Sequence, residues 1–101
     1  MITSDKMHDI LKVFVSNLSH LAVKQRSRIY RYKISVLVKD GKHDANPVII
    51  NQIRLILEKC GFEITKKVYG RKKYYYTIIF DKERDFEKLK KLLSLINENN
   101  T

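Results

Sequence analysis

Two runs of β-forming residues around a tight turn constrain the fold more than any other feature of this chain. Residues 62–69 and 72–80 alternate in polarity and flank Gly70-Arg71. Alternation with a period of two indicates strands, and a short connection that contains glycine indicates that they pair as a hairpin. The residues expected on the inward faces of these strands are Phe62, Ile64, Val68, Tyr74, Tyr76, Ile78 and Phe80.

Two amphipathic segments near the ends of the chain are expected to form helices. In residues 4–23 apolar positions recur every three or four residues, and Thr3 or Ser4 can cap the start. These positions are Met7, Leu11, Phe14, Leu18 and Leu21. The alternative is a helix broken at Ser16-Asn17, after a short β-forming run. Residues 81–97 are expected to form the last helix, with Phe86, Leu89, Leu92, Leu93 and Ile96 turned inward.

The middle of the chain predicts one strand, a loop and one helix. Residues 29–38 alternate, which places Tyr30, Tyr32, Ile34, Val36 and Val38 on one face of a strand. Residues 39–45 form the loop. Asn46-Pro47 begins the helix, because Asn is a good cap and Pro fits the first helical position. This helix runs to Cys60, where Gly61 ends it. Its apolar residues surround much of its girth, so we expect it to be well buried.

The resulting order, α-β-α-β-β-α, favours an α+β fold in a single domain over residues 1–101. We expect a three-stranded antiparallel or mixed sheet with helices packed on one face. This is the order of a ferredoxin-like split fold that lacks its last strand. Residues 97–101 are polar and are expected to fray.

Composition excludes several classes of protein. No apolar run approaches the roughly 18 residues that a membrane-spanning helix needs, and the N-terminus lacks the pattern of a secretory signal. Cys60 is the single cysteine, so the chain cannot form an internal disulfide or a cysteine-rich zinc site. A reducing, cytoplasmic setting is therefore expected.

Charge gives the strongest indication of function. Lys and Arg number 21 against 11 Asp and Glu, for a formal net charge of +10, which favours a polyanionic partner. Residues 24–33 and 66–73 are both rich in basic residues and contain no acid. Residues 81–91 instead mix both signs, with pairs such as Asp85/Lys88, which is typical of a solvated helix surface.

Both basic stretches lie on strands or at strand ends, so their outward residues are expected to meet on the open face of the sheet. Cations there neutralise phosphates, and tyrosine rings stack on bases, as in proteins that bind single strands on a sheet. We therefore predict a small basic protein that binds DNA or RNA mainly through phosphate, with weak sequence preference. The expected contact residues are Lys24, Arg26, Arg28, Arg31, Lys33, Lys67, Tyr69, Arg71, Lys72, Lys73 and Tyr75.

Two other interpretations use the same residues. Lysine on edge strands prevents sheets from pairing, and tyrosine is favoured in strands for packing alone, so the basic surface is then simply solvated. Alternatively, the surface docks on an acidic protein partner as an inhibitor or interaction module. A homodimer is also expected, through the apolar stripe of the first helix or the open edges of the sheet.

A further alternative comes from residues 48–80, where a helix ends in Cys60-Gly61 and a hairpin rich in Lys and Tyr follows. This stretch resembles the final helix and wing of winged-helix transcriptional regulators. The resemblance implies that Arg71 and Lys72, at the hairpin tip, enter a groove of duplex DNA. The chain departs from that pattern because a long strand and one proline-started helix leave little space for a separate second helix.

The best enzymatic pattern is the loop over residues 40–44. An Asp-x-Lys triplet at a strand end is typical of metal-dependent nucleases, in which Asp40 and Asp44 would hold Mg²⁺. Such a site needs a further acid on a neighbouring strand, and none is well placed. A polar turn followed by a helix cap is therefore favoured, and we predict no catalytic activity, metal or cofactor.

Overall fold

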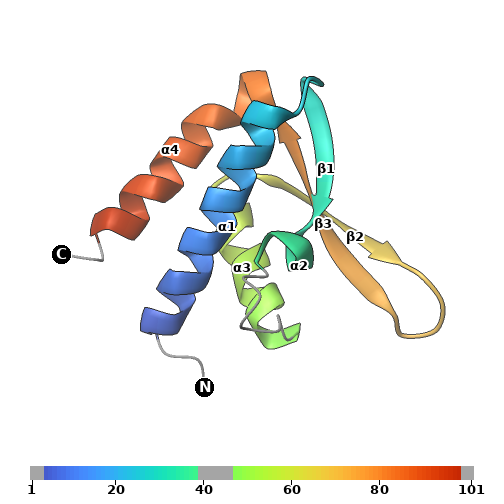
Figure 1. Cartoon of the computed structure of the whole chain (residues 1–101). Coiled ribbons are helices and arrows are strands. Elements are labelled where there is room, and N and C mark those ends of the chain that lie inside the picture. Colours follow the sequence, from blue (N-terminus) through green and yellow to red (C-terminus); the bar gives the residue numbers. More distant parts are fainter. Residues whose placement is uncertain (1–3, 39–46, 99–101) are drawn as a thin grey trace.

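The computed structural model describes residues 4–38 and 47–98 and shows helices packed on one side of a small sheet (Figure 1). The elements in chain order are α1 (Ser4–Lys24), β1 (Ile29–Lys33), α2 (Ile34–Leu37), α3 (Pro47–Lys59), β2 (Glu63–Val68), β3 (Tyr74–Asp81) and α4 (Lys82–Glu98). The predicted α+β class is confirmed. None of the described helices is both long and apolar enough to cross a membrane.

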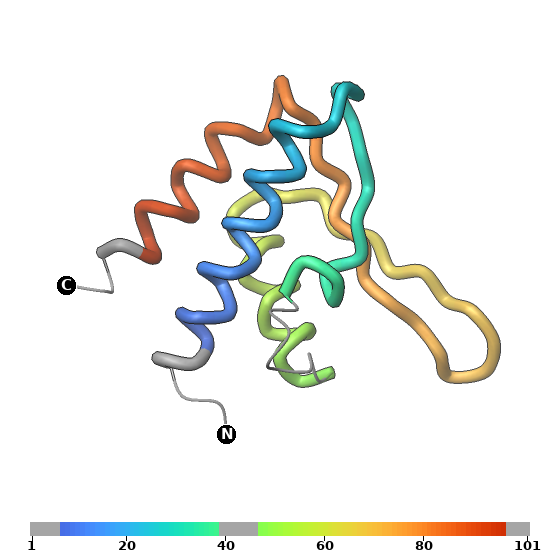
Figure 2. Tube along the Cα trace, viewed as in Figure 1, coloured from blue at the N-terminus to red at the C-terminus, as the bar shows by residue number. Residues whose placement is uncertain are grey.

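The three strands form an antiparallel sheet in the order β1-β3-β2. Ile29 lies opposite Asp81 and Lys33 opposite Thr77, so β1 covers only the second half of β3. Val68 pairs with Tyr74 in the hairpin. The tip of this hairpin projects beyond the helices, in Figure 1 and in the trace of Figure 2. The sheet therefore has a covered half and a projecting half.

The prediction of one strand over residues 29–38 is wrong after Lys33. The chain turns there into α2, which buries both Ile34 and Leu37 and leaves Val36 57% exposed. A strand would place Ile34 and Leu37 on opposite faces, whereas a helical turn brings positions i and i+3 to the same face. Burial of this pair against the core favours the helix over continued alternation.

The first helix is continuous, as predicted. Its stripe packs in the core through Leu11, Phe14 and Leu18. The alternative break at Ser16-Asn17 does not occur, and the Asn17 amide donates a hydrogen bond of 2.7 Å to the carbonyl of Leu37. A polar residue within α1 thus satisfies the end of α2.

Two expectations about helix burial are wrong. In α3, Ile49, Ile53 and Leu57 are buried, but the opposite side exposes Val48 by 60% and Leu55 by 44%. This side is exposed because the sheet and α2 contact α3 only on its inner side. In α4, Phe86 and Leu93 are also partly exposed, while Leu89, Leu92 and Ile96 are buried as predicted.

Asp85 does not belong to a solvated helix surface, because its side chain is fully buried at the start of α4. One carboxylate oxygen accepts the backbone N–H of Asp81 at 2.8 Å. Arg84 and Lys88 form ion pairs with the same carboxylate at 2.9 and 3.1 Å. Burial raises the pKa of Asp85, but the hydrogen bonds from Arg84, Asp81 and Lys88 outweigh it and hold that pKa below its ordinary value. Asp85 therefore fixes the junction between β3 and α4.

Candidate nucleic-acid interface

Basic and tyrosine side chains gather on the outward face of the sheet, toward the hairpin tip. Lys33 ends β1 at this side, and Lys67 pairs directly with Tyr75 across the hairpin. The Lys33 ammonium lies 4.4 Å from the centre of the Tyr75 ring, and the Tyr69 and Tyr75 rings are 5.7 Å apart. We define the hairpin cluster as Lys33, Lys67, Tyr69, Arg71, Lys72, Lys73 and Tyr75.

The hairpin cluster is free of nearby negative charge in the described part of the chain. Residues 64–80 contain no Asp or Glu. Neither do residues 29–38 or 47–57, which supply the neighbouring surface of β1, α2 and α3. Among the described residues, no ion pair engages a lysine or arginine of the cluster. These cations are therefore available to an external anion.

The remaining predicted contacts lie elsewhere. Lys24, Arg26 and Arg28 lie before β1, at the end of the sheet that is opposite to the hairpin tip. Residues 74–81 of β3 separate the two ends by about 23 Å at ~3.3 Å per residue. Arg28 contacts Asp81 at 3.4 Å and Glu83 at 3.5 Å, so its charge is partly compensated. Arg31 is exposed between the two ends.

The structure adds side chains that sequence reasoning placed in the core or left out. Tyr74, expected inward, is 48% exposed because the hairpin extends past the helices. The Lys66 ammonium lies 4.3 Å from the centre of the Tyr74 ring, and the Arg54 guanidinium of α3 lies 4.8 Å from that of Tyr76. Both faces of the projecting half therefore pair cations with aromatic rings. The sequence does contain a signal for this. Lys66-Lys67 and Tyr74-Tyr75-Tyr76 are runs of consecutive residues, so each run places side chains on both faces of its strand.

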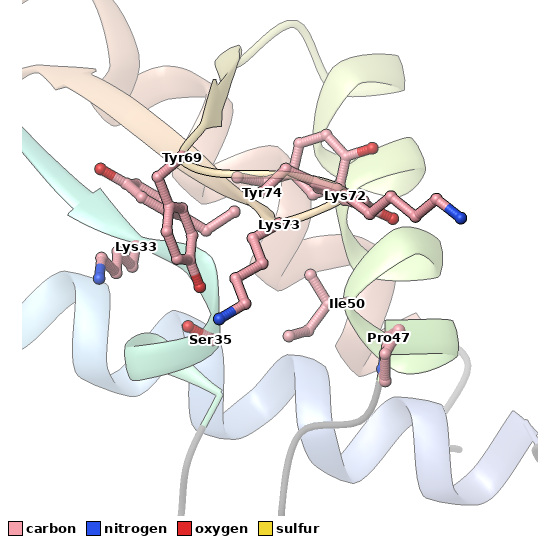
Figure 3. Close-up of a pocket in the computed structure, with 10 residues that line it drawn as sticks. Lys33, Ser35, Pro47, Ile50, Tyr69, Lys72, Lys73 and Tyr74 are labelled. Carbon is pink, nitrogen blue, oxygen red and sulfur yellow. The ribbon is translucent and has the colours of Figure 1, made fainter.

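A cleft of about 420 Å³ opens between the hairpin and the helices. Figure 3 shows its lining side chains coming from the hairpin, from the end of β1, from the start of α2 and from the first turn of α3. Pro47 and Ile50 form the α3 wall, and the hairpin wall is made of tyrosines. Lys33, Lys72 and Lys73 add positive charge. The cleft thus borders the hairpin cluster directly.

No catalytic or metal arrangement emerges from the described residues. They contain no cluster of three or more His, Cys, Asp or Glu side chains suited to a metal ion. Asp40 and Asp44, with the rest of the nuclease-like loop, lie outside the described residues. Burial raises the pKa of the Cys60 thiol, which opposes formation of a reactive thiolate.

No protein-family model matches the chain, and searches of curated proteins and of solved structures find no significant match.

Proposed function

We propose that this protein binds nucleic acid through the hairpin cluster. The observation that carries the proposal is the projecting hairpin, on which residues 66–73 supply five basic side chains and no acid. Projection brings these cations to phosphates before the body of the protein makes contact. Neutralised phosphates release counterions, so this surface supplies affinity that does not depend on sequence.

Duplex DNA is the favoured ligand because α2, a helix of four residues, adds to the winged-helix resemblance. The order α1-β1-α2-α3 followed by a hairpin contains a separate helix before α3, for which the sequence indicated little space. In such an arrangement the second helix of the pair enters the major groove. The exposed side of α3 carries Val48 and Leu55, which suit contacts with thymine methyl groups, and Asn51, whose amide oxygen accepts hydrogen bonds from Arg54 at 3.2 and 2.7 Å. The hairpin then reaches the adjacent backbone.

Binding of a single strand across the open sheet is the competing mode. It depends on rings that are open to stacking. Tyr69 is 55% exposed, but Lys33 lies over one side of the Tyr75 ring and the Tyr69 ring lies 5.7 Å from it, so little of the Tyr75 ring is left for a base. The mixture of charge near Glu63, which contacts Arg84 at 3.4 Å, further limits the open face. These contacts favour the duplex mode.

The test is fluorescence anisotropy with labelled duplex DNA, single-stranded DNA and single-stranded RNA at about 50 and 200 mM salt. We expect the duplex to bind most tightly and the affinity to fall steeply with salt. The double variant Lys67→Gln/Arg71→Gln is expected to weaken duplex binding at least tenfold. Its control is Lys12→Gln/Lys91→Gln, which removes the same charge from exposed positions of α1 and α4.

Two results would contradict the proposal. Equal weakening by both double variants would mean that only net charge matters. Absence of binding to all three ligands at low salt would reject nucleic acid and favour an acidic protein partner.

We also propose a homodimer, for which the sequence indicated either the α1 stripe or the open edges of the sheet. The α1 stripe is buried within the monomer, so it is not available. Phe86 and Leu93 lie seven residues apart on α4 and are both partly exposed, which suits a helix-helix contact. Light scattering after gel filtration is expected to give twice the 12.0 kDa chain mass. The Leu93→Glu variant is expected to give the single-chain mass, and a single-chain mass for the unmodified protein would reject the dimer.

A further inference from the structure

The cleft beside the hairpin combines features that the phosphate-binding surface alone does not need. It opens where β3 continues past the end of β1, since Lys33 is the last residue paired with β3 on that side. One wall is aromatic, with Tyr74 and Tyr76, and the other is formed by Pro47 and Ile50 of α3. Lys66 lies over one side of the Tyr74 ring and Arg54 over one side of the Tyr76 ring, so each ring has one side left for stacking. Two apolar walls with an open entrance form a slot that suits a flat ring.

The edge of the slot also carries backbone hydrogen-bonding groups. The Tyr69 N–H donates to the carbonyl of Lys73 at 2.9 Å, so the peptide groups of Lys73 face β2. Peptide groups alternate along a strand of an antiparallel pair, so those of Tyr74 face away from β2. On that side β1 has already ended, and the groups of Tyr74 border the cleft. A donor and an acceptor are thus set beside the aromatic wall.

The charged side chains that line the cleft are all positive. Lys33, Lys72 and Lys73 line it, and Figure 3 shows Lys73 pointing from the hairpin toward the helices. None of the described lining residues is acidic. Cations beside a flat apolar slot match an anion that is covalently attached to an aromatic ring. The volume of about 420 Å³ lies in the range of small-molecule sites.

We propose that this cleft takes one unpaired nucleotide of the bound nucleic acid. The base enters between the tyrosine wall and Ile50, its edge meets the backbone groups of Tyr74, and its phosphate meets the lysines. The proposal rests on the proposed nucleic-acid function and adds a preference for duplexes that carry an unpaired nucleotide. An acidic peptide satisfies the lysines but leaves the aromatic wall without a stacking partner, so it is the less favoured occupant.

The experiment compares a blunt duplex with the same duplex carrying one unpaired terminal nucleotide. Stacking of one base is worth about 1–3 kcal/mol, so the unpaired nucleotide is expected to tighten binding about tenfold. Tyr74→Ala removes part of the aromatic wall, and Ser35→Trp fills the cleft from α2. Both variants are expected to lose this tenfold preference while they bind the blunt duplex as before. Val68→Ala is the matched control, because Val68 is an exposed hairpin residue outside the cleft.

A second measurement uses backbone amide NMR spectra of the unmodified protein. Thymidine monophosphate is expected to shift the amide signals of both Tyr74 and Lys73. Deoxyribose phosphate, which lacks the base, is expected to leave the Tyr74 signal in place. This readout does not depend on whether a variant folds.

Three outcomes would overturn the inference while leaving the proposed function intact. The first is equal affinity of the unmodified protein for the two duplexes. The second is that Tyr74→Ala and Ser35→Trp weaken binding of both duplexes equally, which would make the cleft part of the general phosphate-binding surface. The third is binding of a short polyglutamate peptide that Ser35→Trp abolishes, which would assign the cleft to an acidic peptide. If the unmodified protein binds neither duplex, the proposed function itself is rejected.

Discussion

Asp85 shows how one residue organises the junction that carries the hairpin. Its buried carboxylate accepts the backbone N–H of Asp81 and pairs with Arg84 and Lys88. Asp85→Asn removes the charge but keeps the size, so that Lys88 loses its ion pair and Arg84 keeps only its ion pair with Glu63. We expect the free energy of unfolding to fall by about 2–3 kcal/mol, because the variant loses the charge-assisted hydrogen bonds that Arg84 and Lys88 donate to the buried carboxylate. Urea unfolding measures this loss, and Glu87→Gln, at an exposed pair with Lys90, is the control with little effect.

The same carboxylate predicts a pH dependence of stability. The pKa of Asp85 in the folded protein lies below its ordinary value of 3.8. The unfolded chain therefore binds the proton more readily, and protonation favours unfolding. The stabilisation is present above pH 3.8 and is lost as the pH falls through the lower folded pKa. Thermal unfolding at a series of acidic pH values is expected to show a steeper decline for the unmodified protein than for Asp85→Asn. Parallel curves would contradict this assignment.

Tyr30 gives the opposite case, a buried polar group whose removal is favourable. Its hydroxyl is buried and has no hydrogen-bond partner among the described residues. Burial, with the nearby Tyr32 and Asp85, raises the pKa of Tyr30 above its ordinary value, so the hydroxyl stays protonated. Because an unsatisfied buried hydroxyl costs about 1–3 kcal/mol, Tyr30→Phe is expected to raise the melting temperature. A lower melting temperature would show that the hydroxyl has a partner in solution.

At the scale of elements, the periodicity of the sequence predicted the long regular elements. It did not predict α2, where the chain changes direction after β1. The stripe of α1 and the alternation of the hairpin are long enough to identify their elements. The segment over residues 34–38 is short, and its residues fit a strand as well as a turn of helix. Only the core decides, by burying Ile34 and Leu37 together. A tertiary constraint of this kind is not visible in local pattern.

The hairpin turn makes its own prediction about backbone strain. Gly70 and Lys72 both adopt left-handed φ angles, +70° and +58°. A side chain disfavours this conformation by roughly 1–2 kcal/mol relative to glycine. Lys72→Gly is therefore expected to be more stable than Lys73→Gly by at least about 1 kcal/mol, although both remove one charge from the tip. Chemical unfolding of the two variants checks the difference, and equal stabilities would show that the turn relaxes in solution.

At the scale of the whole molecule, the sequence predicted that the basic residues lie on strands and at strand ends. It did not predict that they separate into two groups, one at the hairpin tip and one at the opposite end of the sheet. Both acid-free stretches lie on strands or at strand ends, yet β1 runs antiparallel to β3. Its basic start therefore lies at the opposite end from the hairpin tip, and only Lys33 joins the cluster. The acids that compensate Arg28 come from the β3–α4 junction, far away in sequence. Such pairing depends on strand register, which composition does not contain.

This division predicts how the salt dependence of binding responds to substitution. For a duplex, the slope of log affinity against log salt is about −0.9 for each phosphate that the protein neutralises. Lys67→Gln/Arg71→Gln is therefore expected to reduce the magnitude of the slope by about 1.8. Lys24→Gln/Arg26→Gln removes the same charge from the far end of the sheet and is expected to leave the slope unchanged. Because both variants have the same net charge, equal slopes would mean that DNA wraps both ends, and a reversed order would move the interface away from the hairpin.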